Sequence, residues 1–204
     1  MPPVANDRKQ RVVAELRRSE ILAAAAKVFA NKGFEATRME EIAKAAKLAK
    51  GTLYRYFESK DEVYQATVEQ ALGKLATLTD EHVKQAPDFP AKLAAFIEVR
   101  ITFWHEHQQL YRIIMTINRL EPHRRRSHKW QLETVLYLKK LFEEAATKDE
   151  IPKQDFLAAA WTTMDAVRGM NERRAFSQEG SADEQARFLT GFLLGGLRAS
   201  GRVA

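Results

Sequence analysis

The chain has 204 residues, a net charge of +6 and no cysteine. This length allows a small domain with a second, larger core beside it. The lack of cysteine excludes disulfides and thiolate chemistry, and it favours a reducing, cytoplasmic setting. The first twenty residues lack the apolar core of a signal peptide, and no stretch approaches the roughly eighteen apolar residues of a spanning helix. We therefore expect a soluble protein without a membrane partner.

The positive charge is concentrated at the N-terminal end. Residues 1–60 contain 13 Lys or Arg against 7 Asp or Glu, whereas residues 61–204 contain 20 of each kind. Clustered basic residues bind polyanions because they neutralise phosphates and release counterions. From charge alone, a solvated basic face and a DNA-binding face are equally acceptable.

The apolar residues recur at intervals of three and four along the chain, and no useful length alternates with period two. The six prolines fall where this period breaks, so they mark helix ends. We predict an all-α fold of about nine helices, with a DNA-binding domain over residues 1–60 and a second domain over residues 61–204. The predicted helices cover residues 10–31, 38–45, 49–57, 59–79, 93–104, 107–118, 122–146, 152–177 and 182–200. Apolar residues, Leu132 and Leu136 among them, lie almost all round the helix over 122–146, so we expect it to be buried on several sides.

Local signals define the ends of the first helices. Gly33 is expected to stop the first helix. Thr37 with Glu40, and Ser59 with Glu62, have the spacing of capping boxes that open two later helices. The stretch before residue 10 has no apolar period and is predicted to be disordered. Its basic residues Arg8 and Lys9, with Arg11, would form a solvated tail or lie along a phosphate backbone or minor groove.

The two short helices have the features of a helix-turn-helix. Ala43 and Ala46 allow them to cross closely, and Leu48 fills the turn, so the second helix can project into a major groove. Basic side chains also stand at the starts of two neighbouring helices, at Arg38 and Lys60, beside the positive ends of the helix dipoles. Tyrosines of the second helix could instead be packing residues. The exposed positions of the second helix are Lys50, Gly51, Thr52, Tyr54, Arg55 and Tyr56.

The string I-A-x-x-A-x-L-x-K-G-T-L-Y-R-Y-F-x-S-K, residues 42–60, resembles the helix-turn-helix signature of the tetracycline-repressor (TetR) family. Residues 25–43 resemble the segment that precedes it in that family. The resemblance implies a homodimer with a ligand-sensing C-terminal domain. It also implies that Tyr54 and Lys60 chiefly contact the DNA backbone, and that the phosphate and base contacts include Thr37, Lys50, Thr52 and Tyr56.

Two residues depart from the family pattern. Lys47 stands where the turn usually has glycine, and Ala49 stands where a serine commonly caps the recognition helix. A lysine at positive φ and a missing cap each cost about 1 kcal/mol. A phosphate contact from Lys47 would offset the first cost, so we include Lys47 among the DNA-binding candidates.

The last helix has the composition of a dimer face. Small residues let a neighbouring helix approach closely, and with residues 152–177 this helix would form a four-helix bundle across a twofold axis, as the resemblance also implies. The same glycines could instead pack inside one chain. The predicted dimer residues are Phe188, Gly191, Phe192, Gly195, Gly196 and Ala199.

Large side chains and a few charges of the second domain are effector-binding candidates. Arg100 lies on an apolar stripe, and a charge there must be paired or meet a ligand. Core packing by the large residues and an internal Arg–Asp pair are the alternatives. We expect a small, mostly apolar effector with one polar or acidic group. The candidates are Arg100, Trp104, Tyr111, Tyr137, Trp161, Met164, Asp165 and Arg168.

No pattern of residues indicates an enzyme. The Glu-x-x-His, G-x-S-x-G and glycine-rich phosphate motifs are absent, and His105 and His107 point to different helix faces, so we expect no catalytic residues, metal or cofactor. The basic run at 124–129 is a solvated helix end or a second DNA contact. The sequence thus predicts an effector-responsive repressor that binds a pseudo-palindromic operator as a homodimer. An effector-independent, nucleoid-type DNA-binding protein is the alternative.

Overall fold

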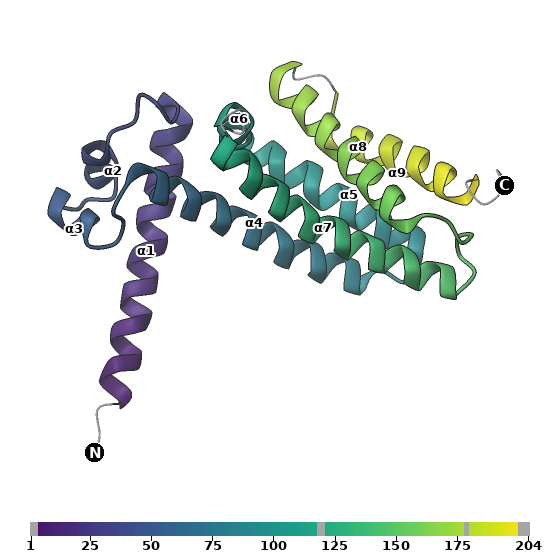
Figure 1. Cartoon of the computed structure of the whole chain (residues 1–204), viewed down its shortest axis with the longest axis horizontal. Helices are drawn as coiled ribbons and strands as arrows, with labels where there is room; N and C mark the ends of the chain where they lie inside the picture. The colour runs from purple at the N-terminus through teal and green to yellow at the C-terminus, as the bar shows by residue number, and fades with distance from the viewer. Residues whose placement is uncertain (1–3, 118–120, 178–179, 200–204) are drawn as a thin grey trace. The chain divides into compact units, whose positions relative to one another are not determined.

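The structure is a computed structural model, and it describes residues 4–117, 121–177 and 180–199. These residues form nine α-helices and no strand (Figure 1), which confirms the predicted all-α fold. The chain divides into two compact units, an N-terminal unit (Met1–Gly73) and a C-terminal unit (Lys74–Ala204). The division falls inside the long helix α4 (Lys60–Gln85), whereas the sequence suggested a boundary at residue 60.

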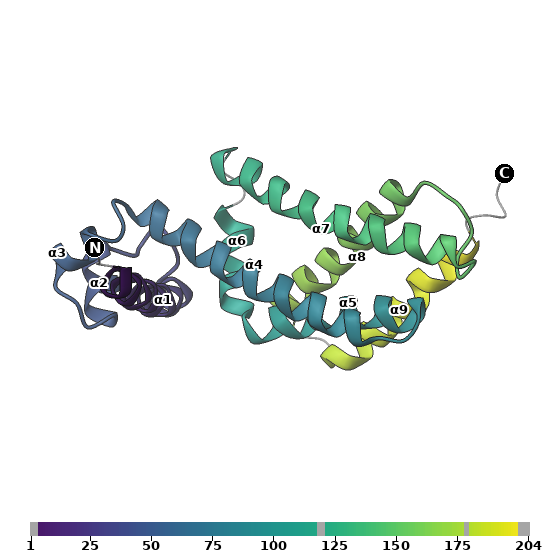
Figure 2. The ribbon, with the colours of Figure 1, turned by 90° about the horizontal axis from the view of Figure 1, so that it is seen from below.

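The N-terminal unit contains α1 (Val4–Lys32), α2 (Met39–Ala45), α3 (Lys50–Tyr54) and the first part of α4. In Figure 2, α1 is seen nearly end-on, with α2 and α3 to one side of it. The predicted contact between α2 and the residues of the second short helix is confirmed, because Ile42, Ala43, Leu53 and Phe57 are all buried. Apolar residues of α1 and α4 in the same unit are buried as well, namely Ile21, Leu22, Ala25, Phe29, Val63 and Tyr64.

Helix α1 is longer than the sequence indicated. It begins at Val4, so the prediction that the stretch before residue 10 is disordered is wrong for residues 4–9. The end of the helix was predicted correctly, since Gly33 follows it at φ 78° and its N–H donates to the carbonyl of Phe29 over 2.8 Å. A helix that is polar on most sides has no apolar period, and its start therefore leaves little trace in the sequence.

The first predicted capping box is wrong. The hydroxyl of Thr37 donates to the carbonyl of Gly33 (2.6 Å), in the turn that closes α1. Helix α2 therefore begins one residue later, with Arg38 as its N-cap and the N–H of Arg38 donating to Glu41 Oε2 (3.0 Å). Of the second predicted capping box, one of the two hydrogen bonds is present: the N–H of Glu62 donates to Ser59 Oγ over 3.1 Å.

The C-terminal unit contains the rest of α4 with α5 (Phe89–Glu106), α6 (Gln108–Ile117), α7 (Glu121–Thr147), α8 (Phe156–Ser177) and α9 (Ala182–Ala199). Helix α5 packs against α8 and α9, and α7 packs against α8 (Figure 1). Within the described ranges, no helix is both long and apolar enough to cross a membrane. The apolar cluster of this unit includes Phe89, Leu93, Phe96, Ile97, Ile101, Val135, Leu138, Phe142, Ala160 and Leu189.

Two features of the C-terminal helices differ from expectation. Helix α7 was predicted to be buried on several sides, yet Leu132 and Leu136 are 38% and 50% exposed, and only its other face is buried. Helix α8 begins at Phe156 and not at Pro152, because the carboxylate of Asp155 accepts the N–H groups of Leu157 and Ala158, both over 3.0 Å. An N-cap of this kind fixes where a helix begins.

Candidate nucleic-acid interface

The turn between α2 and α3 has the geometry that its sequence predicted. Lys47 adopts φ 57°, a left-handed conformation that favours glycine. The N–H of Lys47 donates to the carbonyl of Lys44 (3.1 Å), and that of Leu48 donates to the carbonyl of Ala43 (2.8 Å). This pair of bonds is a Schellman motif, which ends α2 and turns the chain toward α3. The predicted positive φ of Lys47 is confirmed.

Helix α3, the candidate recognition helix, is shorter than the predicted range 49–57. Ala49 is its N-cap and offers no side-chain acceptor, as predicted. The helix ends at Tyr54, with Arg55 as C-cap, and the chain then turns so that Phe57 enters the core. Leu53 is fully buried and anchors the helix from its inner side.

The outer side of α3 presents donors and aromatic rings. Lys50, Gly51, Tyr54 and Arg55 are exposed, while Thr52 and Tyr56 are half-buried. Tyr54 is 41% exposed, so its ring is not a core residue. A Cβ added at Gly51 would meet no atom within 4 Å, which shows open surface there. A short helix with such a surface can lie close to groove edges and phosphates, which are rich in acceptors.

The amino group of Lys50 is held by a carboxylate of the neighbouring helix. Lys50 Nζ forms an ion pair with Glu40 Oε1 of α2, and it lies 5.8 Å from the centre of the Tyr54 ring. The hydrogen bond from Lys50 lowers the pKa of Glu40, and Glu40 in turn raises the pKa of Lys50. Both groups therefore stay charged near neutral pH.

Three other DNA-binding candidates lie at the starts of α2 and α4. Arg38 is exposed. Thr37 is buried with its hydroxyl bonded to Gly33, as described above. Lys60 Nζ donates to the carbonyls of Phe34 (2.8 Å) and Glu35 (3.1 Å). Thr37 and Lys60 thus have partners within the chain, and their contacts with DNA stay predictions.

Arg18 is a residue near α3 that the sequence reasoning missed. Its Nη1 atom lies 3.5 Å from the carbonyl oxygen of Tyr56, and its guanidinium lies 4.3 Å from the centre of the Phe57 ring. The signal that could have found it is the spacing of seven residues to Ala25, which is buried on the same side of α1.

The predicted dimer residues form an exposed face on α9. Phe188 and Phe192 are 66% and 70% exposed, and their rings stack with centroids 6.2 Å apart. A Cβ added at Gly191, Gly195 or Gly196 would meet no atom within 4 Å, so these glycines do not allow a close approach within the chain. Ala199 is exposed as well.

Arg100 is the buried charge of the C-terminal unit. Its Nη1 donates to Thr79 Oγ1 (2.6 Å), and its guanidinium lies 3.9 Å from the centre of the Phe96 ring, on which Tyr137 stacks at 6.3 Å. Among the residues that the structure describes, Arg100 forms no ion pair. Burial lowers the pKa of Arg100 to about 9. The side chain therefore carries a charge that an anionic group could neutralise.

The remaining effector candidates, apart from Tyr137, make their contacts with residues other than Arg100. Tyr111 contacts Trp104 (ring centroids 5.1 Å apart), and its hydroxyl donates to the carbonyl of Arg168 (3.1 Å). Trp161 stacks on His128 at 5.5 Å, and Met164 packs against the core cluster. Asp165 and Arg168 form an exposed ion pair of 3.0 Å. These two residues thus form an Arg–Asp pair, but it lies at the surface and is not the internal pair of the alternative.

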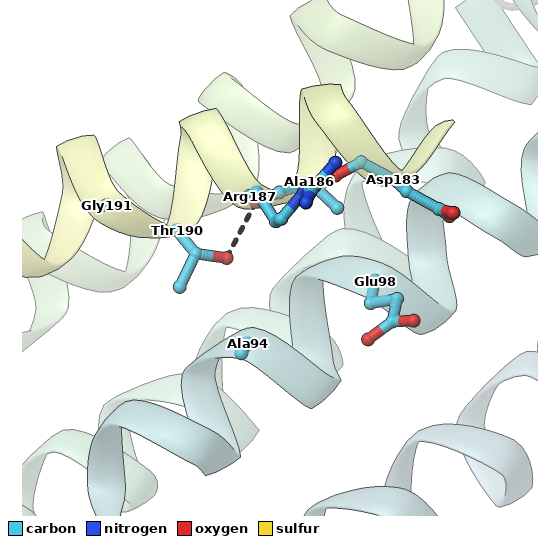
Figure 3. A pocket seen from close by; sticks show the side chains of 7 residues that line it. All are labelled: Ala94, Glu98, Asp183, Ala186, Arg187, Thr190 and Gly191. Atoms are coloured by element: carbon cyan, nitrogen blue, oxygen red, sulfur yellow. Dashed lines mark hydrogen bonds between the residues drawn. The ribbon is translucent and has the colours of Figure 1, made fainter. Parts of the chain in front are cut away.

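One described pocket lies between α5 and α9, and the sequence reasoning did not predict it (Figure 3). Its volume is about 600 Å³. Of the predicted site residues, Gly191 alone lines it. The α9 members are three and four residues apart, a spacing that places them on one helix face. The lining residues are Ala94, Glu98, Asp183, Ala186, Arg187, Thr190 and Gly191.

Comparisons with known proteins relate the chain to bacterial regulators. The family described as "Bacterial regulatory proteins, tetR family" matches residues 21–67. The HTH-type transcriptional activator FasR of Mycolicibacterium smegmatis is 33% identical over 113 residues, which are 55% of this chain and 52% of that protein. The Fatty acid metabolism regulator protein of Bacillus subtilis is 31% identical over 78 residues, 38% of this chain and 40% of that protein. The chain thus spans about half or less of these relatives' lengths.

A solved structure has the same fold as the chain. The fatty acid degradation regulator FadR from Bacillus halodurans superimposes with a TM-score of 0.79 at 21% identity, over 89% of this chain and 96% of that one. At this identity the likeness concerns the fold, and it extends beyond the N-terminal helices into the C-terminal unit.

Proposed function

We propose that this chain is a DNA-binding transcriptional regulator of the TetR family. It represses transcription by binding a pseudo-palindromic operator as a homodimer until a small effector releases it. The observation that carries the proposal is the surface of α3, where Lys50, Tyr54 and Arg55 are exposed on a helix anchored by the buried Leu53. Two such helices would enter successive major grooves about 34 Å apart.

The α9 face supports the proposed homodimer. Phe188 and Phe192 are large, apolar and mostly exposed in the single chain, and open glycines lie beside them. Contiguous apolar surface of this kind is uncommon on a monomer. A second copy would cover the phenylalanines, and the glycines would let the two α9 helices approach closely.

Arg100 supports the proposed class of effector, a mostly apolar molecule with one acidic group. The guanidinium of Arg100 is buried beside a hydroxyl and an aromatic ring, and within the described ranges no carboxylate forms an ion pair with it. A buried charge is costly without such a partner. A carboxylate from the effector would supply that partner, while the surrounding aromatic residues suit an apolar body. Binding would favour a spacing of the two α3 helices that no longer fits the operator.

The test begins with selection of operator DNA from a random library, followed by footprinting of the selected sequence. We expect protected half-sites whose centres are 10 to 10.5 base pairs apart, or a multiple of that. Dodecanoate should then release the DNA more strongly than dodecanol, which has the same chain length but no acid. Uniform binding to all sequences, with no effect of either compound, would support the nucleoid-type alternative and refute the proposal.

The role of Arg100 is tested with the same pair of compounds. In an Arg100→Leu variant we expect dodecanoate and dodecanol to act equally, because the group that distinguishes an acid from an alcohol has been removed. A variant that still prefers the acid as strongly as the original chain would show that Arg100 does not bind the effector.

A further inference from the structure

The first half of α1 extends beyond the packed core of the N-terminal unit (Figure 1). Every side chain from residue 8 to residue 17 is exposed, and burial begins only at Ile21. Residues 8–18 nevertheless contain five basic residues and one acidic residue. A helix of this kind gains little stability from packing, and its net positive charge makes it a candidate surface for a polyanion.

The basic residues Arg8, Arg11 and Arg18 form a stripe on one side of α1. Arg11 and Arg18 are seven residues apart, as are Arg18 and Ala25, and seven residues make about two helical turns. This line is therefore the continuation of the side that packs into the core at Ala25. Arg8 lies three residues before Arg11, on the neighbouring turn.

The stripe begins beside the recognition helix. Arg18 contacts the carbonyl of Tyr56 and the ring of Phe57, the two residues that follow α3 and its C-cap. From Arg18, the helix carries the stripe about 15 Å further to Arg8, at about 1.5 Å per residue. Double-stranded DNA has one phosphate charge per about 1.7 Å of its axis, so this length spans several phosphates.

We propose that Arg8, Arg11 and Arg18 bind backbone phosphates of the DNA that flanks the groove entered by α3. The inference rests on the proposed binding of DNA by α3. Charge complementarity favours DNA as the partner, and contact with Arg18 makes the stripe continuous with the α3 surface. Because the segment is already helical, little ordering is required when it binds, in contrast to a disordered arm. Phosphate contacts fix register and add affinity without reading sequence.

The other side of α1 offers a matched control. Val13 and Leu16 are exposed there, and Lys9 lies on the same side because it is four residues before Val13 and seven before Leu16. Arg17 is also turned away from the stripe and pairs with Glu20 over 2.7 Å. An Arg8→Gln/Arg11→Gln variant and a Lys9→Gln/Arg17→Gln variant therefore remove the same charge from different sides of one helix.

The experiment measures operator affinity as a function of salt concentration for the full chain and both variants. Each phosphate contact contributes about 0.9 to the slope of log affinity against log salt. We expect the stripe variant to lower that slope by about 1.8 per subunit and to weaken binding roughly tenfold near 0.15 M salt. The control variant should keep the original slope. Equal slopes for the stripe variant and the original chain, or an equal loss in the control, would overturn the proposal.

Two further variants distinguish loss of charge from a structural effect, and DNA from a second copy of the chain as the partner of α1. Arg8→Lys/Arg11→Lys retains the charge and should bind like the original chain, and a loss in this variant would indicate a structural role that contradicts the proposal. Val13→Gln/Leu16→Gln should leave both DNA binding and sedimentation unchanged. If it changed the oligomeric state, α1 would be a docking surface for a second copy instead of DNA.

A failure of the stripe and a failure of the α3 interface give different results. Stripe variants should weaken operator and random DNA by the same factor, since phosphates carry no sequence information. Lys50→Ala, which removes an exposed donor of α3 that is not assigned chiefly to the backbone, should instead reduce the preference for operator over random DNA. Normal preference in Lys50→Ala would refute the α3 interface, and an unchanged salt slope in the stripe variant would refute the stripe alone.

Discussion

The two units of the chain are both helical, but they differ in how their functional residues are arranged in the sequence. The candidates in and around the helix-turn-helix of the N-terminal unit fall within residues 37–60, on consecutive elements. The effector candidates of the C-terminal unit come from α5, α6, α7 and α8, which are up to 68 positions apart, from Arg100 to Arg168. The family match covers residues 21–67. A function built from one local segment can thus be predicted from sequence, whereas one assembled from distant helices cannot.

The largest expected effect comes from substitutions in the C-terminal unit, which should lower the operator affinity of the N-terminal unit. In Phe188→Glu/Phe192→Glu, two carboxylates on the α9 face would have to be buried without partners in a dimer. We expect a monomer at micromolar concentration in sedimentation, and operator affinity reduced by about 100-fold or more, because one tethered half-site contact is lost.

The control for this variant is Leu132→Glu/Leu136→Glu, which changes exposed leucines of α7 in the same unit. It should remain dimeric and bind operator normally. If Phe188→Glu/Phe192→Glu stayed dimeric, or if Leu132→Glu/Leu136→Glu became monomeric, the α9 face would not be the interface.

The next effect is confined to the N-terminal unit. Tyr54→Ala removes a ring that is 41% exposed, so we expect operator binding to weaken about 10-fold to 100-fold, with the thermal midpoint nearly unchanged. Fluorescence anisotropy and thermal unfolding measure the two quantities. A large fall in the midpoint would mean that the ring acts through packing and not through DNA.

A smaller effect on the free energy of unfolding is expected at the two residues with left-handed backbone, one in each unit. Lys47→Gly should raise the free energy of unfolding by about 1 kcal/mol, because glycine adopts positive φ without strain, and should weaken DNA binding through loss of a cation. Asp149→Gly, also at φ 57°, should raise the free energy of unfolding by a similar amount, measured by chemical denaturation, without any change in DNA binding. Equal or tighter binding by Lys47→Gly at fixed salt would refute a phosphate contact of Lys47.

The smallest expected effect concerns helix caps. Ala49→Ser would give α3 the side-chain acceptor that it lacks, so we expect unfolding to require about 0.5–1 kcal/mol more. Asp155→Ala in the C-terminal unit should cost about 1 kcal/mol, since it removes the acceptor of two N–H groups of α8. Denaturant unfolding checks both changes, and a loss of stability in Ala49→Ser would contradict the assignment of Ala49 as an uncapped N-cap.

Several predictions from the sequence were wrong, each for a physical reason that the structure shows. The apolar period located most helices, but it failed for the start of α1, where the helix has no buried face at residues 8–17. It also suggested that Leu132 and Leu136 were buried, because an apolar residue looks the same in a sequence whether or not a neighbour covers it. The Thr37 cap was misplaced because Gly33 competes for the same hydroxyl.

The sequence by itself determined the helical fold, the positive φ of Lys47 and the uncapped start of α3, because these depend on residues that are close along the chain. The tertiary structure decided which charges are buried and which are exposed. Arg100 is enclosed by Thr79 and Phe96, whereas Asp165 and Arg168 lie at the surface, although all three were effector-binding candidates. Burial depends on the helices that pack alongside, and their positions follow from contacts between distant segments.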